Sequence, residues 1–131
     1  MSKSLSDELI CQKSDLPHYA PPGHGGTVNV RLFDRSFCEN FEMVLGVMEP
    51  GGVAHKHHHK IEHQAMYVLG GVAEVTLGDE DPVSCGAGSV IKLPPLVDHH
   101  VLSKGPDPLQ LMIVYSPPLA KRGDTPLDET A

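Results

Sequence analysis

Four histidines of this chain have a type and spacing that point to metal chemistry. His57, His59 and His63 lie close together, and His99 follows further along the chain. Imidazole is the commonest protein ligand for divalent transition metals, and two strands packed together would bring all four rings around one ion. The sequence therefore predicts one divalent transition metal per chain, held by these four side chains.

Neutral donors leave the charge of such an ion uncompensated. Four imidazoles around a divalent cation keep its full charge in the pocket, so anionic ligands are expected to bind there. An all-nitrogen shell favours iron, nickel, copper or zinc over manganese, although metal availability can override affinity. A six-coordinate ion would keep two positions open for a chelating substrate, or for a substrate and O₂. The alternative, a closed structural zinc site, uses all four positions and usually recruits cysteine.

Strand alternation assigns the neighbours of these histidines to faces. His57 and His59 project to one side of an extended chain, and His63 would share a face with Tyr67 on the next strand. Gln64 could replace His63 as a ligand, but on this reasoning it should face the other way.

A second register of the histidine cluster stays open. His55 and His57 could form the pair, with Glu62 as a carboxylate ligand. In the first register Glu62 is adjacent to a ligand and could orient an imidazole N–H from outside the ligand set.

Three further residues are candidates for the wall of a substrate pocket, namely Tyr67, Ile113 and Tyr115. His18 and His24 lie in a stretch rich in proline and glycine and are expected at the surface. No residue is assigned a catalytic role, because the pocket offers no recognisable general acid or base.

Short β-branched and aromatic stretches between glycine and proline turns predict an all-β domain. The expected strands cover residues 27–33, 41–48, 65–69, 72–77, 83–85, 89–93, 99–102 and 109–115, with a turn at 49–52. Strands this short at near-regular intervals are typical of a barrel or sandwich. We expect an irregular N-terminal arm over residues 1–26, a β-barrel domain over residues 27–116, and an extended or disordered tail over residues 117–131.

Length and charge limit the possible partners. The 131 residues suit one domain, and a formal net charge of −7 without a basic patch argues against nucleic acid and anionic membranes. No apolar run approaches the ~20 residues that cross a bilayer and the start lacks a signal peptide, so a soluble cytoplasmic protein is expected. Three cysteines without a CxxC pair predict neither a disulfide framework nor a thiolate zinc site. Hydrolase, phosphate-loop and dinucleotide motifs are absent from the sequence.

The spacing of the histidines resembles that of the cupin superfamily. The first cupin motif reads Gly, five residues, HxH, three or four residues, Glu, six residues, Gly. With three residues before its fourth member, and histidine in place of glutamate, this chain matches the motif at Gly51, His57, His59, His63 and Gly70. The second motif, Gly, five residues, PxG, two residues, His, is matched with leucine in place of its second glycine at Gly88, Pro94, Leu96 and His99. The resemblance covers about residues 40–115 and implies a double-stranded β-helix, the jelly-roll barrel of cupins.

Histidine at position 63 resembles the small manganese-containing four-histidine monocupins. From that resemblance we expect a metal-dependent oxidoreductase of dioxygenase type that acts on a small anionic or enolisable substrate. Two alternatives remain: a non-redox isomerase, cyclase or lyase acting on a sugar acid or polyketide-like substrate, and a noncatalytic cupin that binds a metal or small ligand. Single-domain cupins often pair, so a homodimer is expected.

Overall fold

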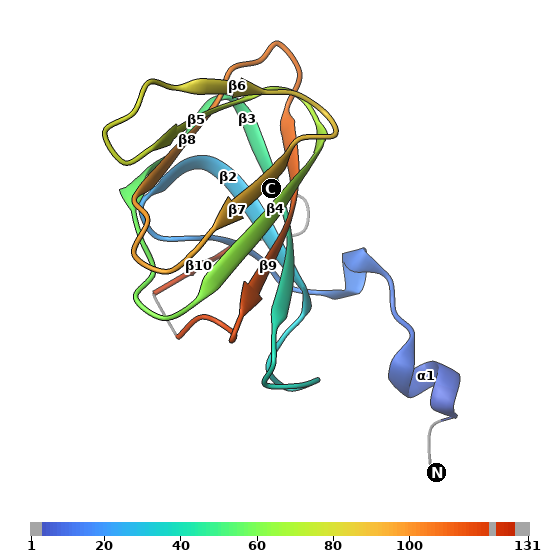
Figure 1. Ribbon diagram of the computed structural model, residues 1–131. Coiled ribbons are helices and arrows are strands. Elements are labelled where there is room, and N and C mark those ends of the chain that lie inside the picture. The colour runs from blue at the N-terminus through green and yellow to red at the C-terminus, as the bar shows by residue number, and fades with distance from the viewer. Residues whose placement is uncertain (1–3, 121–122, 128–131) are drawn as a thin grey trace.

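The longest element of the fold is one strand that pairs with three others. The computed structural model describes residues 4–120 and 123–127, and strand β3 (Glu42–His57) runs through the middle of the arrangement in Figure 1. The other elements, in chain order, are α1 (Leu5–Leu9), a 3₁₀ turn (Lys13–Asp15), β1 (His18–Ala20), β2 (His24–Phe33), β4 (His63–Gly70), β5 (Ala73–Leu77), β6 (Val83–Cys85), β7 (Val90–Leu93), β8 (His99–Ser103), β9 (Leu109–Ser116) and β10 (Thr125–Leu127). None of the described helices has the length and apolarity needed to span a bilayer.

Strand β3 changes partners at a bend. Its first half, Glu42–Met48, pairs with β9, and its second half pairs with β8, while β2 runs along the other edge. The bend falls at residues 49–52, where Gly51 has a φ of 85° that glycine adopts without strain. The sequence predicted a turn that ends the strand here. The strand continues instead because pairing with β2 resumes beyond the bend, at Val53 and Ala54.

The other strands close the sheet around a shared interior. From β3 one path leads through β8 and β5 to β6, and another leads through β9 and β4 to β7. Every pairing along these paths is antiparallel, and the strands curl around one interior in Figure 1. The predicted all-β barrel is therefore confirmed.

The two ends of the chain contain more regular structure than the sequence predicted. Residues 1–26, expected to be irregular, include α1, β1 and the start of β2, and the tail contributes β10, which pairs with β1. An ion-pair network connects the tail to β2 and β3. Arg31 donates from Nε to Oε2 of the buried Glu42 at 2.9 Å and pairs with Asp124 of the tail, while Glu42 Oε1 accepts the Leu119 backbone N–H at 2.6 Å. Most of the predicted tail beyond residue 120 lies outside the described residues.

Alternation along β4 divides its side chains between the interior and the outer surface. Gln64, Met66 and Val68 are buried, whereas His63 and Tyr67 are exposed. The predicted assignment of these two faces is therefore wrong, because the inward set begins one residue later than the sequence analysis placed it. The buried members join a core that consists of Val44, Met48, Ala54, Met66, Val68, Ala73, Val75, Ile91, Leu93, Val101, Leu109, Leu111, Ile113, Tyr115 and Leu119.

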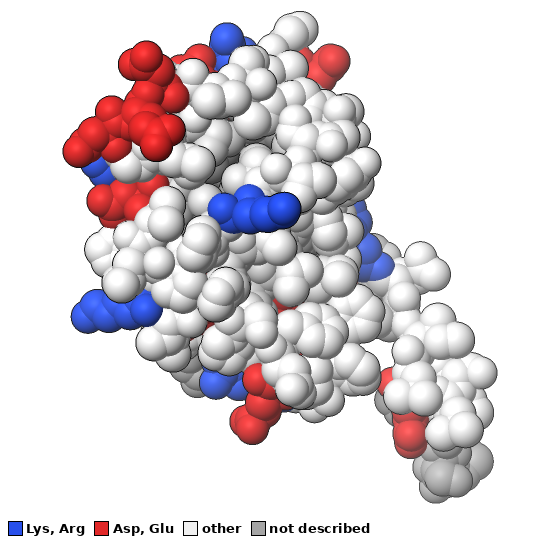
Figure 2. All heavy atoms as spheres, viewed as in Figure 1, with Lys and Arg blue, Asp and Glu red and all other residues white. Residues whose placement is uncertain are grey.

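An apolar surface faces outward over β4, β7 and β9. Tyr67 is 47% exposed, its cross-strand neighbour Val90 is 63% exposed, and Met112 lies opposite Tyr67 on the other side. Leu69 extends this surface along β4. We call these four residues the outer face. Figure 2 shows that few charged side chains lie over β4 and β7, whereas acidic side chains gather at the upper left, near the turn between β5 and β6.

Candidate metal centre

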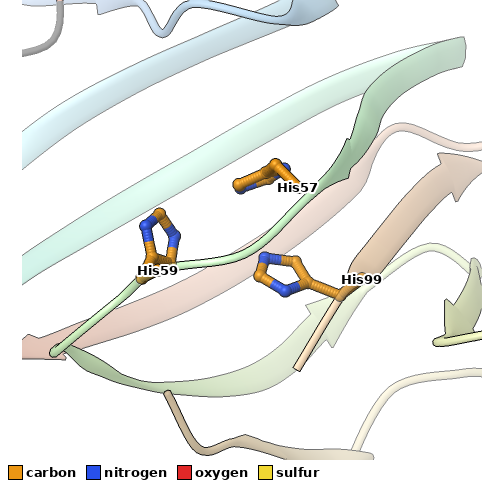
Figure 3. A group of neighbouring side chains, drawn as sticks. All are labelled: His57, His59 and His99. Atoms are coloured by element: carbon orange, nitrogen blue, oxygen red, sulfur yellow. The ribbon is translucent and has the colours of Figure 1, made fainter. Parts of the chain in front are cut away.

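Three of the four predicted ligands come together at one end of the barrel interior. His57 ends β3, His59 lies in the loop that follows, and His99 begins β8. One ring nitrogen from each lies within 4.8 Å of the other two, and the ring centroids of His57 and His99 are 4.3 Å apart. Figure 3 shows the three rings turned toward one another. This spacing allows three imidazoles to share one divalent cation.

Backbone carbonyls hold two of these rings in one tautomer. His57 Nδ1 lies 2.7 Å from the His55 carbonyl oxygen, and His99 Nδ1 lies 3.0 Å from the Val97 carbonyl oxygen. A carbonyl oxygen only accepts hydrogen bonds, so each Nδ1 must carry the proton and donate it. The lone pair of each neutral ring is then on Nε2, which is the atom available to a metal.

Burial keeps the His99 ring neutral. Only 2% of His99 is exposed, and this desolvation lowers its pKa to about 4, although the hydrogen bond to Val97 opposes the shift. Its Nε2 is buried and has no hydrogen-bond partner in the described part of the chain. A neutral ring with a buried, unshared lone pair is in the state that a metal ligand requires.

The loop that carries His59 is tied directly to the turn before His99. The Leu96 N–H donates to the His59 carbonyl oxygen at 2.8 Å. Leu96 has a φ of 73°, the left-handed conformation that glycine adopts most easily. The residue that replaces the motif glycine thus keeps the glycine-like backbone, and the spacing to His99 is preserved.

The fourth predicted ligand, His63, lies away from this cluster. His63 is exposed on the outer side of β4 and lines a separate shallow surface with Ser116 and Lys92. The adjacent Gln64 is 6% exposed and lines the same cavity as His57 and His99. A four-histidine centre is therefore not confirmed.

Gln64 presents an unshared amide oxygen to this cavity. Its Nε2 donates to the sulfur of Met66 at 3.3 Å, while its Oε1 is buried and has no hydrogen-bond partner among the described residues. Buried polar atoms are nearly always paired in folded proteins, so this oxygen is a further candidate metal ligand, in addition to the three histidine rings.

A glycine contact supports aligning position 64, and not position 63, with the fourth member of the motif. The first cupin motif permits four residues after HxH, and this count leads from His59 to Gln64 and then, after six residues, to Gly71. Gly71 has a φ of 76°, and a Cβ there would lie 2.4 Å from the Pro108 carbonyl oxygen. At Gly70 a Cβ would meet nothing closer than 3.8 Å. The glycine that the fold requires is therefore Gly71.

His57 and His99 line a small cavity of about 30 Å³ that is partly open to solvent. Ile113 and Tyr115, two of the predicted pocket residues, line it, whereas Tyr67 lies on the outer face. The ring centroid of Tyr115 lies 5.5 Å from that of His59. Glu62 lies in the loop before β4 and is not part of the cavity wall.

Three polar residues of β2, His24, Thr27 and Asn29, line this cavity. His24, expected at the surface, lines it with its ring centroid 6.3 Å from that of His57, and its Nδ1 lies 3.2 Å from Thr27 Oγ1. Asn29 lines it as well. Alternation along the strand could have placed Thr27 and Asn29 on the inward face, whereas it does not place His24 there.

The remaining histidines of the cluster point away from the centre. His58 is exposed, and its Nδ1 lies 2.7 Å from Asp98 Oδ1. His55 is exposed and its ring packs against that of His100. The second register, which paired His55 with His57, is therefore not the one that the structure assembles.

Comparison with known proteins agrees with this geometry. Residues 44–115 match the family model described as the Cupin domain, which is more than half of the chain. The chain belongs to the cupin family. No curated protein matches the sequence.

Solved structures resemble this cupin at low sequence identity. The polyketide cyclase RemF from Streptomyces resistomycificus is 21% identical, with 97% of this chain and 86% of that chain covered and a TM-score of 0.73. A predicted oxalate decarboxylase from Thermotoga maritima is 18% identical, with 82% and 98% covered and a TM-score of 0.72. A sugar phosphate isomerase of the cupin superfamily from Silicibacter pomeroyi is 16% identical, with 82% and 74% covered and a TM-score of 0.70. At these identities the likeness shows the fold alone, and it supports the jelly-roll assignment.

The donor set of this cupin fits a divalent transition metal. Two of the candidate ligand atoms, His99 Nε2 and Gln64 Oε1, are buried polar atoms with no protein partner in the described residues. Imidazole nitrogen suits zinc, iron, nickel and copper, and an amide oxygen is an acceptable harder ligand beside it. His57 and His59 complete the set.

Proposed function

We propose that this cupin is a metal-dependent enzyme that acts on a small anionic substrate by non-redox chemistry, such as isomerisation, cyclisation or lyase chemistry. The observation that carries the proposal is the cluster of His57, His59 and His99 beside Gln64, which lines the same cavity as His57 and His99; His99 Nε2 and Gln64 Oε1 are buried and have no hydrogen-bond partner in the described residues. A bound divalent cation would supply Lewis-acid polarisation of a substrate oxygen.

The charge of the cavity favours an anion. All four candidate ligands are neutral groups, with two rings held as Nδ1–H tautomers by main-chain carbonyls. Among the described residues, no Asp, Glu, Lys or Arg lines the cavity. A substrate carboxylate in the cavity would therefore meet no charged side chain. Its counter-charge would be the divalent cation bound by the histidines.

The walls of the cavity exclude water from the reacting end. Met48, Met66, Val101, Leu111 and Ile113 line it, and each is buried. In an apolar surrounding of this kind, electrostatic interactions with the substrate are stronger than in water. These residues therefore strengthen binding of the anionic group without contacting a charge themselves.

The choice of non-redox chemistry follows from two observations. The dioxygenase hypothesis depended on a resemblance to four-histidine monocupins, and His63 lies outside the cluster. The structural neighbours carry the names cyclase, decarboxylase and isomerase, which denote reactions without net oxidation of the substrate by O₂. Dioxygenase activity remains the second candidate because the same neutral donor set would also suit iron.

Metal analysis of two adjacent variants tests the proposed centre. His57→Ala removes a ring that faces the cluster, whereas His58→Ala removes the next ring, which points outward to Asp98. Protein purified without added metal is expected to retain close to one equivalent in the wild type and in His58→Ala, and to lose it in His57→Ala. Equal metal content in the two variants would contradict the assignment.

An oxygen electrode separates the two reaction classes. Turnover of small carboxylic acids and sugar acids is followed in parallel with and without O₂, using the zinc-loaded and the iron-loaded protein. Non-redox chemistry predicts equal rates in both conditions and no O₂ consumption. Turnover that stops without O₂ would refute the proposal in favour of a dioxygenase.

A further inference from the structure

Asn29 carries a second unpaired acceptor in the cavity, separate from the candidate metal ligands. It lies in the middle of β2, is 3% exposed, and its Oδ1 is buried with no hydrogen-bond partner in the described part of the chain. Such atoms are uncommon in folded proteins, because a buried carbonyl oxygen without a partner loses its hydration and gains nothing.

A neighbour across the β1–β2 pair fixes the direction of this amide. Tyr19 lies opposite Asn29, and the Asn29 side chain hydrogen-bonds to the Tyr19 hydroxyl. The Arg31 guanidinium packs 4.1 Å from the centre of the Tyr19 ring, which holds that ring in place. With its N–H side engaged by Tyr19, the amide presents Oδ1 to the interior.

A glycine across the β2–β3 pair makes room for this oxygen. Gly46 lies opposite Asn29, and a Cβ at Gly46 would lie 2.9 Å from Asn29 Oδ1 and 3.4 Å from Ile113 Cδ1. The φ of Gly46 is not in the left-handed region, so the backbone does not require glycine here. Glycine destabilises the interior of a strand, so its presence here needs another reason. At this position it leaves space above β3 for Asn29 Oδ1.

The chemistry of the cavity limits what can bind to Asn29 Oδ1. The group must donate a hydrogen bond, and it must do so in a cavity whose wall carries no Asp or Glu. An ammonium group would be buried there without a counter-ion, which is costly. A hydroxyl group donates a hydrogen bond and carries no charge, so it is the donor that suits this site.

We propose that Asn29 Oδ1 accepts a hydrogen bond from a substrate hydroxyl, and that the substrate class is a small hydroxy acid whose carboxylate binds at the His57, His59 and His99 cluster. This inference rests on the proposed function for the position of the carboxylate. Asn29 is then the residue that distinguishes a hydroxy acid from the same acid without the hydroxyl. Gly46 keeps the amide in the orientation that this recognition needs.

Matched acids test the inference with the zinc-loaded protein. The probes are 3-hydroxybutyrate and 4-hydroxybutyrate against butyrate, and lactate against propionate, with dissociation constants measured by calorimetry. The wild type is expected to bind at least one hydroxy acid about tenfold or more tightly than its partner, and Asn29→Leu is expected to bring that ratio close to one. Asn40→Leu, the same change at an exposed asparagine outside the cavity, should keep the wild-type ratio.

A nuclear magnetic resonance experiment reads the same contact without depending on the metal. The chain has two asparagines and three glutamines, so the Asn29 side-chain amide signals are identified by their absence in Asn29→Leu. In the zinc-loaded and the metal-free protein, the hydroxy acid should shift these signals more than its partner acid does.

The outcomes separate this inference from the proposed function. Suppose that the protein binds zinc, but that Asn29→Leu still prefers the hydroxy acid or that the wild type shows no such preference. Either result overturns the role of Asn29 and leaves the metal centre intact. If the wild type does not bind zinc, the proposed function is overturned. The Asn29 amide signals of the metal-free protein then test the contact with the hydroxyl group by themselves. A crystal structure with the hydroxy acid bound and only an ordered water on Oδ1 would also refute the contact.

Discussion

Acid is expected to destabilise the metal-free protein through one side chain, His99. Burial lowers the pKa of His99 to about 4 in the folded chain, whereas its ordinary value is 6.5. Because the folded-state pKa is the lower of the two, the unfolded chain takes up the proton first as the pH falls. The stability contributed by neutral His99 is therefore fully present above pH 6.5 and is lost as the pH falls toward 4.

The two pKa values set the size of this loss. One pKa unit corresponds to about 1.4 kcal/mol, so the difference between 6.5 and about 4 amounts to about 3 kcal/mol when the loss is complete. About 2 kcal/mol of it falls between pH 7 and pH 5. This is a substantial part of the ~5–15 kcal/mol that stabilises a typical domain.

Urea denaturation at pH 7, 6 and 5 in the presence of a chelator measures the effect. The free energy of unfolding of the wild type should fall between pH 7 and pH 5 by about 2 kcal/mol more than that of His99→Gln, which cannot take up the proton. His63→Gln, altered at an exposed position outside the cavity, should follow the wild type. Parallel losses in the wild type and His99→Gln would refute the assignment of a buried, neutral ring at this position.

Three other predictions follow from the fold and the site. Gln64→Ala should weaken metal binding on the order of tenfold or more, whereas His63→Ala should leave it unchanged; titration with a competing chelator measures both, and the reverse order would restore His63 as the ligand. Leu96→Gly should raise the free energy of unfolding by about 0.5 kcal/mol, because relief of the left-handed strain exceeds the added freedom of the unfolded glycine, and a lower value in urea denaturation would contradict this. We also propose that two copies associate through the outer face, so Tyr67→Glu should sediment as a monomer while the exposed Ile61→Glu stays dimeric; identical sedimentation of both variants would exclude this face.

The sequence was sufficient to predict three of the clustered histidines and the all-β fold. His57 and His59 are two residues apart on an extended chain, so alternation alone puts them on one side. His99 follows a proline-rich turn at a spacing that the second motif specifies, and the structure retains this spacing even with leucine at position 96. These features depend on local geometry, which a sequence records directly.

The choice between positions 63 and 64 depended on contacts that are distant in sequence. Both faces of β4 carry apolar residues, so the alternation has no unique phase. A contact with a distant segment marks the correct alignment at Gly71, where only glycine fits against the Pro108 carbonyl oxygen. The arrival of Asn29 in the cavity likewise depends on the pairing of β2 with β3, which the sequence does not encode locally.

The protons on the His57 and His99 rings are held by the peptide carbonyls of residues 55 and 97. A mutation exchanges side chains and leaves a peptide carbonyl in place. Positions 55 and 97 can therefore change during evolution without releasing either ring, as long as the backbone keeps its course. Sequence changes in this cupin are therefore expected to alter the residues around the histidine cluster, and with them the molecules that the cavity accepts. They should alter the cluster itself later.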